Sequence, residues 1–179
     1  ALIKKIFLPR EMFPVASVYV AIVHFVPQLV VLLAGSLFYG WMPTVLGLAA
    51  ILAGFAIVTF AALGLGLIFG CLNVFFRDSE NLVDLILMIA TWVSPVLYPA
   101  DRVKDVVPEW IWHVYQANPV TVAVELFHYG FWSTATGESV PGIGSIPVLT
   151  LIGLVGSLIV LGLGQLAFKR TEGKFAQEL

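Results

Sequence analysis

The sequence predicts an all-helical protein that lies in a lipid bilayer and crosses it four times. Two observations carry this prediction. The 179 residues are 60% hydrophobic and only 11% charged, whereas charged residues make up about 25% of an ordinary soluble domain. The stretch from Met12 to Phe76 contains no Asp, Glu, Lys or Arg. The mean hydropathy of +0.99 is too high for a water-soluble chain, so we expect a polytopic membrane protein surrounded by lipid.

The uncharged stretch is long enough for two spans. A hydrocarbon core about 30 Å thick needs roughly 20 apolar residues per helix. The segment "YGWMPT" divides the stretch, because Gly40 and Pro43 interrupt a helix and aromatic side chains suit the membrane interface. We therefore expect spans at residues 15–38 and 45–69, the second reaching Phe76 if its helix continues.

The third and fourth spans follow charged or polar turns. In "FFRDSEN", Asp78 or Ser79 can cap a new helix, and Glu80 is favourable in its first turn. This predicts a third span at 82–98, which ends in "SPVLYP", so that residues 15–98 hold three spans. The apolar stretch 146–168 predicts the last span, and the charged tail 169–179 follows it.

Lysine and arginine set the expected orientation, because they favour the cytoplasmic side of a membrane when they lie in short loops. If residues 1–14 are cytoplasmic, seven of the 9 basic residues lie inside: Lys4, Lys5, Arg10, Arg77, Lys169, Arg170 and Lys174. Only Arg102 and Lys104 then lie outside. We therefore expect both ends of this chain in the cytoplasm and the segment 99–145 on the outer side.

The outer segment is expected to form short helices that do not cross the bilayer. Pro108 and Pro119 divide it into stretches of about 10 residues, which is typical of interfacial or re-entrant helices. Aromatic residues are frequent between Trp92 and Trp132. One interpretation is an aromatic girdle at the membrane interface. The other is a set of rings that face a passage, so that sugars stack on the rings as they move through it. The passage hypothesis assigns Trp92, Tyr98, Trp110, Trp112, Tyr115, Phe127, Tyr129 and Trp132.

No group of residues typical of catalysis or metal binding is found in the sequence. The single Cys71 excludes an internal disulfide and cannot form a zinc site alone. Asp101 and Asp105 are flanked by basic residues and are interpreted as a solvated turn. His24 is expected to form a hydrogen bond between helices. The net charge of −2 leaves no basic surplus for nucleic acid, and no Walker A sequence is present.

Small residues predict places where helices pack closely. Gly66 and Gly70, within "GLGLIFG", are four residues apart and share one face of the second span. Gly153 and Ser157 have the same spacing in the last span. Each pair is expected to let another helix approach.

The charged stretch at residues 1–14 is expected to be a docking element. Its basic residues and its glutamate can pair with charges on a soluble partner, while its prolines make it stiff. The alternative is a polybasic anchor on anionic lipid, for which basic residues interrupted by a glutamate are poorly suited. The docking hypothesis assigns Lys5, Phe7, Leu8, Pro9, Arg10 and Glu11.

These elements, in this order and at these spacings, resemble the permeases of type 2 ABC transporters, especially those that export O-antigen polysaccharide, teichoic acid or related glycans. "FLPREMFP" is similar to their cytoplasmic coupling helix. "NVFFRDSENLVDLILMIATWVSPVLYP" is similar to the region around their fourth and fifth spans. "ANPVT" resembles their Asn-Pro element between two re-entrant helices, and "FKRTEGKFAQEL" resembles their usual ending. The resemblance covers essentially the whole chain.

The resemblance implies a multi-pass permease of the bacterial cytoplasmic membrane that works as a homodimer. It would dock a separate ABC ATPase subunit through the coupling helix and export a lipid-linked polysaccharide, such as O-antigen, galactan or a teichoic-acid-like polymer. ATP and Mg²⁺ would bind that partner, so this chain is expected to carry no cofactor and to be no enzyme. The family pattern also implies an N-terminal amphipathic helix and two spans that are missing from this sequence.

Two other functions stay open at this point. One is an ABC exporter of drugs or lipids. The other is a membrane enzyme or scaffold that acts on lipid-linked sugars, for which paired carboxylates or a metal-ligand cluster near one interface would be expected.

Overall fold

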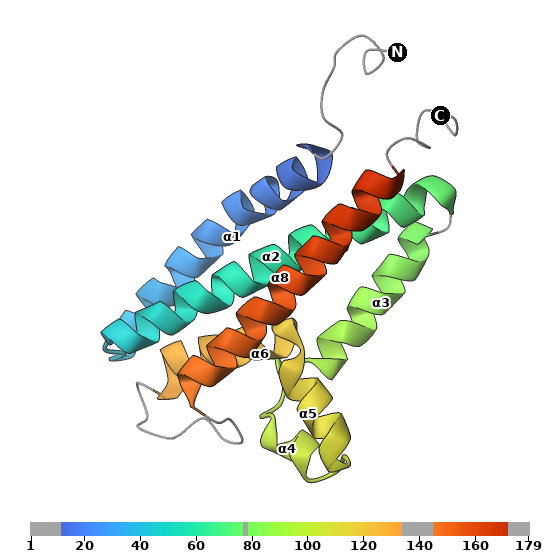
Figure 1. Cartoon of the computed structure of the whole chain (residues 1–179). Helices are drawn as coiled ribbons and strands as arrows, with labels where there is room; N and C mark the ends of the chain where they lie inside the picture. The colour runs from blue at the N-terminus through green and yellow to red at the C-terminus, as the bar shows by residue number, and fades with distance from the viewer. Residues whose placement is uncertain (1–11, 77–78, 134–144, 172–179) are drawn as a thin grey trace.

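The structure is a computed structural model that describes residues 12–76, 79–133 and 145–171, and within these ranges it contains helices and no strand (Figure 1). Three helices are long and apolar enough to cross a membrane: α1 (Met12–Phe38), α2 (Val45–Phe75) and α8 (Ile146–Thr171). The expected docking residues Lys5, Phe7, Leu8, Pro9, Arg10 and Glu11, the Arg77 turn and the tail after Thr171 lie outside the described residues.

The break between α1 and α2 falls where the sequence predicts it. Gly40 has a positive φ of 85°, a backbone conformation that glycine adopts without steric cost. Thr44 then caps α2, because its side chain accepts a hydrogen bond of 3.0 Å from the Gly47 amide. α1 begins three residues earlier than expected, and α2 continues to Phe75.

The third apolar helix is shorter than expected. α3 (Ser79–Val93) ends at Val93, whereas the sequence suggested a span that continues to Tyr98. The "SPVLYP" segment terminates it instead, because the Tyr98 hydroxyl donates to the carbonyl oxygens of Trp92 (3.0 Å) and Val93 (2.8 Å). At 15 residues α3 measures about 22 Å, less than a hydrocarbon core of about 30 Å.

The following segment folds into short helices, as the prolines predict. They are α4 (Asp101–Lys104), α5 (Glu109–Ala117), α6 (Pro119–His128) and the π-helical turn η1 (Tyr129–Ser133). Pro108 immediately precedes α5. Asn118 caps α6 by accepting a hydrogen bond of 3.0 Å from the Val120 amide, and Pro119 occupies the first position of α6, where no amide proton is needed.

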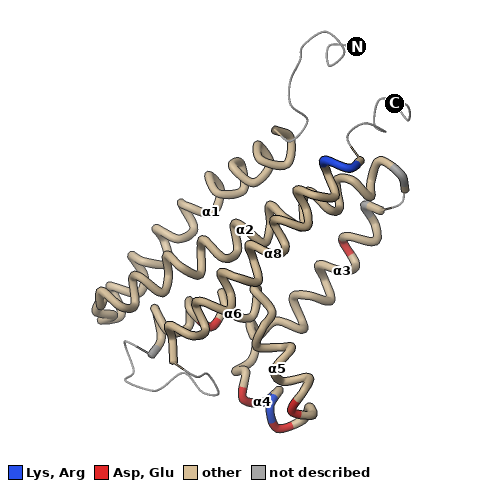
Figure 2. The backbone as a smooth tube through the Cα atoms, viewed as in Figure 1, with Lys and Arg blue, Asp and Glu red and all other residues tan. Residues whose placement is uncertain are grey.

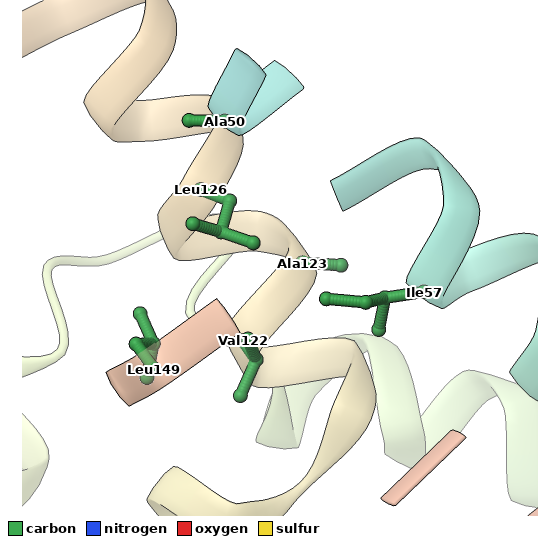
Figure 3. Packing of buried hydrophobic residues seen from close by; sticks show 6 residues of the cluster. All are labelled: Ala50, Ile57, Val122, Ala123, Leu126 and Leu149. Carbon is green, nitrogen blue, oxygen red and sulfur yellow. The ribbon is translucent and has the colours of Figure 1, made fainter. Parts of the chain in front are cut away.

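The main hydrophobic core lies where α6 packs against both α2 and α8 (Figure 3). It consists of Ala50 and Ile57 from α2, Val122, Ala123 and Leu126 from α6, and Leu149 from α8. These residues come from the first halves of α2 and α8, which lie beside the α1–α2 turn. The core thereby fixes α6 against the two long helices.

Glycines determine how closely α2 and α8 approach each other. A Cβ atom on Gly64 would lie 2.6 Å from the Leu161 amide nitrogen, and one on Gly164 would overlap the Gly64 carbonyl oxygen. The expected packing face at Gly66 and Gly70 is wrong for the described chain, because a Cβ atom there would meet no described atom within 4 Å.

The expectation for the last span is confirmed. A Cβ atom on Gly153 would lie 2.6 Å from Val122 Cγ1, and Ser157 is fully buried. These two small residues therefore provide a close contact surface on α8.

The helices give the molecule two distinct ends (Figure 1). The start of α1 and the ends of α2 and α8 lie at one end, and the α1–α2 turn, α4 and α5 lie toward the other. Figure 2 shows that the long helices carry almost no charge between these ends.

Candidate functional site

A cavity of about 460 Å³ lies between α1 and the junction of α6 with η1. We call it the α1–α6 cavity. Its volume is within the range of about 300 to 1,000 Å³ that is typical of small-molecule sites. Its lining is mostly aromatic and aliphatic and consists of Phe25, Gln28, Leu29, Leu32, Phe127, His128, Phe131 and Trp132.

One wall of the cavity is a single face of α1. Phe25, Gln28, Leu29 and Leu32 have the spacing i, i+3, i+4 and i+7, which aligns side chains along one side of a helix. The Phe25 ring stacks on Phe55 of α2, with 5.5 Å between the ring centroids. This contact holds the α1 wall against the rest of the molecule.

The opposite wall depends on a close approach of α6 to α2. A Cβ atom on Gly54 would lie 3.1 Å from the Ala123 carbonyl oxygen and 3.4 Å from Phe127 Cδ2. Gly54 therefore leaves the space that α6 and the Phe127 ring need. A larger side chain at this position would press on the cavity wall.

Trp41, in the α1–α2 turn, contacts the η1 turn by a hydrogen bond and a ring contact. Its indole Nε1 donates a hydrogen bond of 3.0 Å to the Gly130 carbonyl oxygen, and its ring centroid lies 5.2 Å from that of Phe131. Trp41 is only 5% exposed. This buried contact fixes the turn that carries Phe131 and Trp132.

A buried carboxylate lies behind the cavity wall. Glu125 is 3% exposed, and its Oε1 lies 3.8 Å from Nδ1 of His128, one helical turn further along α6. In the part of the chain that the structure describes, this oxygen and the buried Thr121 hydroxyl have no hydrogen-bond partner. An unpaired buried polar group is costly, and no hydrogen bond joins Glu125 Oε1 to the neighbouring imidazole.

A second aromatic group lies in α4, α5 and their connection, away from the cavity. The rings of Trp112 and Tyr115 stack with 5.7 Å between centroids, and both pack in a small buried cluster with Ala100. Burial raises the pKa of the Tyr115 hydroxyl above its usual value, and the nearby Tyr98 and Glu125 raise this pKa further. The Tyr115 hydroxyl is therefore protonated at every physiological pH.

The structure does not bring the eight expected passage residues together. Only Phe127 and Trp132 line the α1–α6 cavity. Tyr129 packs against the main core, and the remaining five lie outside the cavity. Trp112 and Tyr115 are buried, Trp92 and Trp110 are exposed, and the Tyr98 hydroxyl binds the end of α3.

Six residues of the cavity were not assigned to a site by the sequence analysis: Phe25, Gln28, Leu29, Leu32, His128 and Phe131. The spacing of the α1 residues, i, i+3, i+4 and i+7, does indicate that they share one face of a helix. The sequence held no signal that this face lies opposite α6, about one hundred positions later.

Metal-dependent chemistry has no obvious site in the described ranges, because no group of three or more His, Cys, Asp or Glu residues lies close enough together to hold an ion. His24 and Asp84 are exposed on α1 and α3.

Comparison with known proteins agrees with these features. Residues 6–132 match the family described as ABC-2 type transporter. Two curated relatives from Klebsiella pneumoniae are both named O-antigen export system permease protein RfbA. One is 28% identical over 181 residues, which cover 99% of this chain and 64% of the relative. The other is 35% identical over 107 residues, which cover 58% of this chain and 40% of the relative.

The chain therefore spans less than two thirds of the length of the curated relatives that it matches. The family match extends from the charged stretch before α1 to the end of the cavity wall in η1. Because this match covers most of the chain, the protein belongs to the ABC-2 type transporter family, whose members are membrane subunits of transporters.

Proposed function

We propose that the protein is the permease subunit of an ATP-driven exporter that moves a lipid-linked polysaccharide out across the bacterial cytoplasmic membrane. The observation that carries this proposal is the similarity to an O-antigen export permease over 99% of the chain. The exported polymer would be O-antigen, galactan or a teichoic-acid-like chain. Aromatic residues next to the cavity and at the surface support a glycan over an apolar drug.

In this proposal the chain crosses the membrane four times. α1, α2 and α8 each cross alone, and α3 together with the segment up to Tyr98 completes the fourth crossing. Both ends of the chain lie in the cytoplasm. The basic residues Lys169 and Arg170 at the end of α8 support this orientation.

α5 and α6 would form a re-entrant hairpin from the outer side. Support comes from the bend between these helices, which lies against Gly156 near the middle of α8. A Cβ atom on Gly156 would be 3.2 Å from Pro119 Cγ and 3.6 Å from the Ala117 carbonyl oxygen. Backbone that enters the hydrocarbon region must be covered by protein, and α2 and α8 cover α6.

The passage would use aromatic rings as weak binding surfaces for sugars. Rings offer flat apolar faces to the C–H groups of a sugar without demanding a fixed hydroxyl pattern, which suits a polymer that must keep moving. Trp132 and Phe127 in the cavity and the exposed Trp92 and Trp110 would act in this way.

Two partners complete the transporter in this proposal: a second copy of the permease and a separate ABC ATPase subunit that binds ATP and Mg²⁺. The stretch from Lys5 to Glu11 would dock the ATPase. It immediately precedes α1, which forms one wall of the cavity, so a movement of this stretch would be transmitted to the passage.

The test is depletion of the full-length protein from cells of its own organism. We expect a lipid-linked glycan to accumulate on the cytoplasmic side while surface glycan is lost, and restored expression to reverse both changes. Unchanged surface glycan, together with lost efflux of a labelled drug or phospholipid, would contradict the proposal and favour the other class of exporter.

A further inference from the structure

Of the three helices that are long enough to cross a membrane, α1 is the least enclosed by the described chain. No residue of α1 is buried, whereas α2 and α8 each carry fully buried side chains, such as Ile57 and Ser157. The Phe25–Phe55 stack holds α1 near its middle. At its end, the α1–α2 turn is held against η1 by the buried Trp41. The helix is thus held at its middle and at its turn.

Pro27 weakens α1 between these two contacts. It lies inside the helix, and because proline has no amide hydrogen, it cannot donate to the carbonyl oxygen of Val23 one turn earlier. Sharp bends in helices occur mainly at interior prolines and a few similar features. The Pro27 side chain is exposed, so burial in the described chain does not account for the proline. The residue is therefore suited to a bend.

Pro27 also divides the wall that α1 gives to the α1–α6 cavity. Phe25 lies before it, and the other three wall residues of α1 lie after it. The part of α1 after Pro27 leads directly into the turn that Trp41 holds. The part before it, residues 12–26, leads from the proposed docking stretch to the cavity. A bend at Pro27 would therefore move one part of the wall and leave the other in place.

We propose that α1 bends at Pro27, so that residues 12–26 move as one body and carry the Phe25 ring away from Phe55, while the part of α1 after Pro27 keeps its place. A single stacked pair contributes little beyond its buried area, so this contact breaks and forms again without unfolding. The shape of the α1–α6 cavity then depends on the position of residues 12–26. The bend is a property of the permease itself, and only its drive by ATP rests on the proposed function.

The bend is measured as a distance between spin labels in the full-length permease with its ATPase, reconstituted in lipid nanodiscs in a Cys71→Ser background. Leu52→Cys on α2 provides the reference position. Val20→Cys lies before Pro27 and Val31→Cys after it, and all three positions are exposed. Residue 20 is about 10 Å from Pro27 along the helix, so a change of about 20° in the bend displaces it by about 4 Å.

The two label pairs should behave differently. We expect ATP with vanadate to shift the distance between labels at 20 and 52 by about 4 Å, and that between labels at 31 and 52 by less than about 1 Å. Without nucleotide, the first pair should already have the wider distribution of distances. Proteins that carry one label each identify the distances that arise between copies of the permease.

Pro27→Ala restores the amide that α1 lacks. The shift of the first label pair should fall from about 4 Å to less than about 1 Å, and export should fall with it. The melting temperature should stay the same or rise, because alanine favours a helix, whereas a purely structural proline would not lose export at unchanged stability. Pro147→Ala is the matched control and should change neither property, because Pro147 lies in the first turn of α8, where no helical hydrogen bond is missing.

A reversible cross-link provides a second test in the same background. In a protein with Phe25→Cys and Phe55→Cys, a reducible bis-thiosulfonate reagent would hold residues 12–26 against α2. Export should stop on cross-linking and return when dithiothreitol cleaves the link. Ala53→Cys with Leu154→Cys joins α2 to α8, and because both residues pack against the main core, this link should leave export unchanged.

Three results would overturn the inference: equal distributions and shifts for the two label pairs, an undiminished shift in Pro27→Ala, or normal export by the protein cross-linked between 25 and 55. If the ATPase binds and hydrolyses ATP while both label pairs keep one distance, the bend is wrong and the proposed function stands. If the first pair alone shows the wide distribution and no ATPase binds, the bend stands and the proposed function is wrong.

Discussion

At the scale of single residues, the structure explains some positions by local chemistry and others by contacts across the chain. Asn118 and Pro119 are local, since an Asn cap followed by proline starts a helix wherever it occurs. Gly40 is also explained locally, because a turn with positive φ favours glycine whatever its surroundings. Trp41 differs, because its partner Gly130 is 89 residues away. An interfacial tryptophan was expected there from the sequence, but its hydrogen bond was not.

Tyr115 allows a test of burial at this scale. Its raised pKa means that ionisation is less favourable in the folded state than in the unfolded state, where the pKa is near 10.0. The stability linked to this group is present below about pH 10 and is lost as the pH rises above that value. The melting temperature of the Tyr115→Phe variant should therefore fall less steeply between pH 9 and pH 11 than that of the unaltered protein. Thermal melts of the purified protein at a series of pH values measure both slopes.

The stacking partner supplies the control for this measurement. Trp112→Phe shortens the stacked ring but keeps the Tyr115 hydroxyl, so its melting temperature should fall at all pH values by a similar amount. An identical pH slope for Tyr115→Phe and the unaltered protein would contradict the role assigned to burial.

At the scale of helices, hydropathy predicted the long elements well because a span requires an apolar run, and such a run is visible in any sequence window. The end of α3 was missed because it depends on Tyr98 turning back to the carbonyl groups of Trp92 and Val93. The packing face of α2 was also missed. Glycine spacing indicates that a close contact is feasible, but which glycine faces α8 depends on how the two helices are rotated.

The two kinds of glycine in α2 give a direct prediction. Gly64→Ala should separate α2 from α8 and destabilise the protein by about 1 to 3 kcal/mol, because the new Cβ atom overlaps backbone atoms of Leu161. Gly66→Ala, two residues further on, meets no described atom and should be neutral or slightly stabilising, because alanine favours a helix. Thermal melts of both variants, measured side by side, check this. If both variants were destabilised equally, the face of α2 that carries Gly64 would not be the one that packs against α8.

At the scale of the whole molecule, the sequence predicted an all-helical fold, which the structure confirms for the described residues, and the family, which the match to residues 6–132 shows. It did not predict the cavity, which arises only when α1 and α6 lie opposite each other across α2. It also suggested one passage for eight aromatic residues. The structure distributes them among the cavity, a buried cluster and the surface, because helical periodicity and packing orient each ring separately.

The proposed docking of a separate ATPase to residues 5–11 provides the test at this scale. The double substitution Arg10→Ala with Glu11→Ala is expected to remove charge pairs with the ATPase and to reduce glycan-stimulated ATP hydrolysis at least 10-fold in the reconstituted complex. Insertion into the membrane and basal hydrolysis by the free ATPase should not change. Normal stimulation in the double variant would exclude these two residues from the docking role.

The position of Cys71 has a practical use for mapping which parts of the chain face which compartment. This is the only thiol in the 179 residues, and it is 5% exposed, beside Leu67 and Phe168 and 3.2 Å from the Thr171 hydroxyl. A maleimide reagent added to intact cells should leave it unmodified. A cysteine introduced in place of Lys5 or Arg102 would then be the only reactive thiol among these 179 residues.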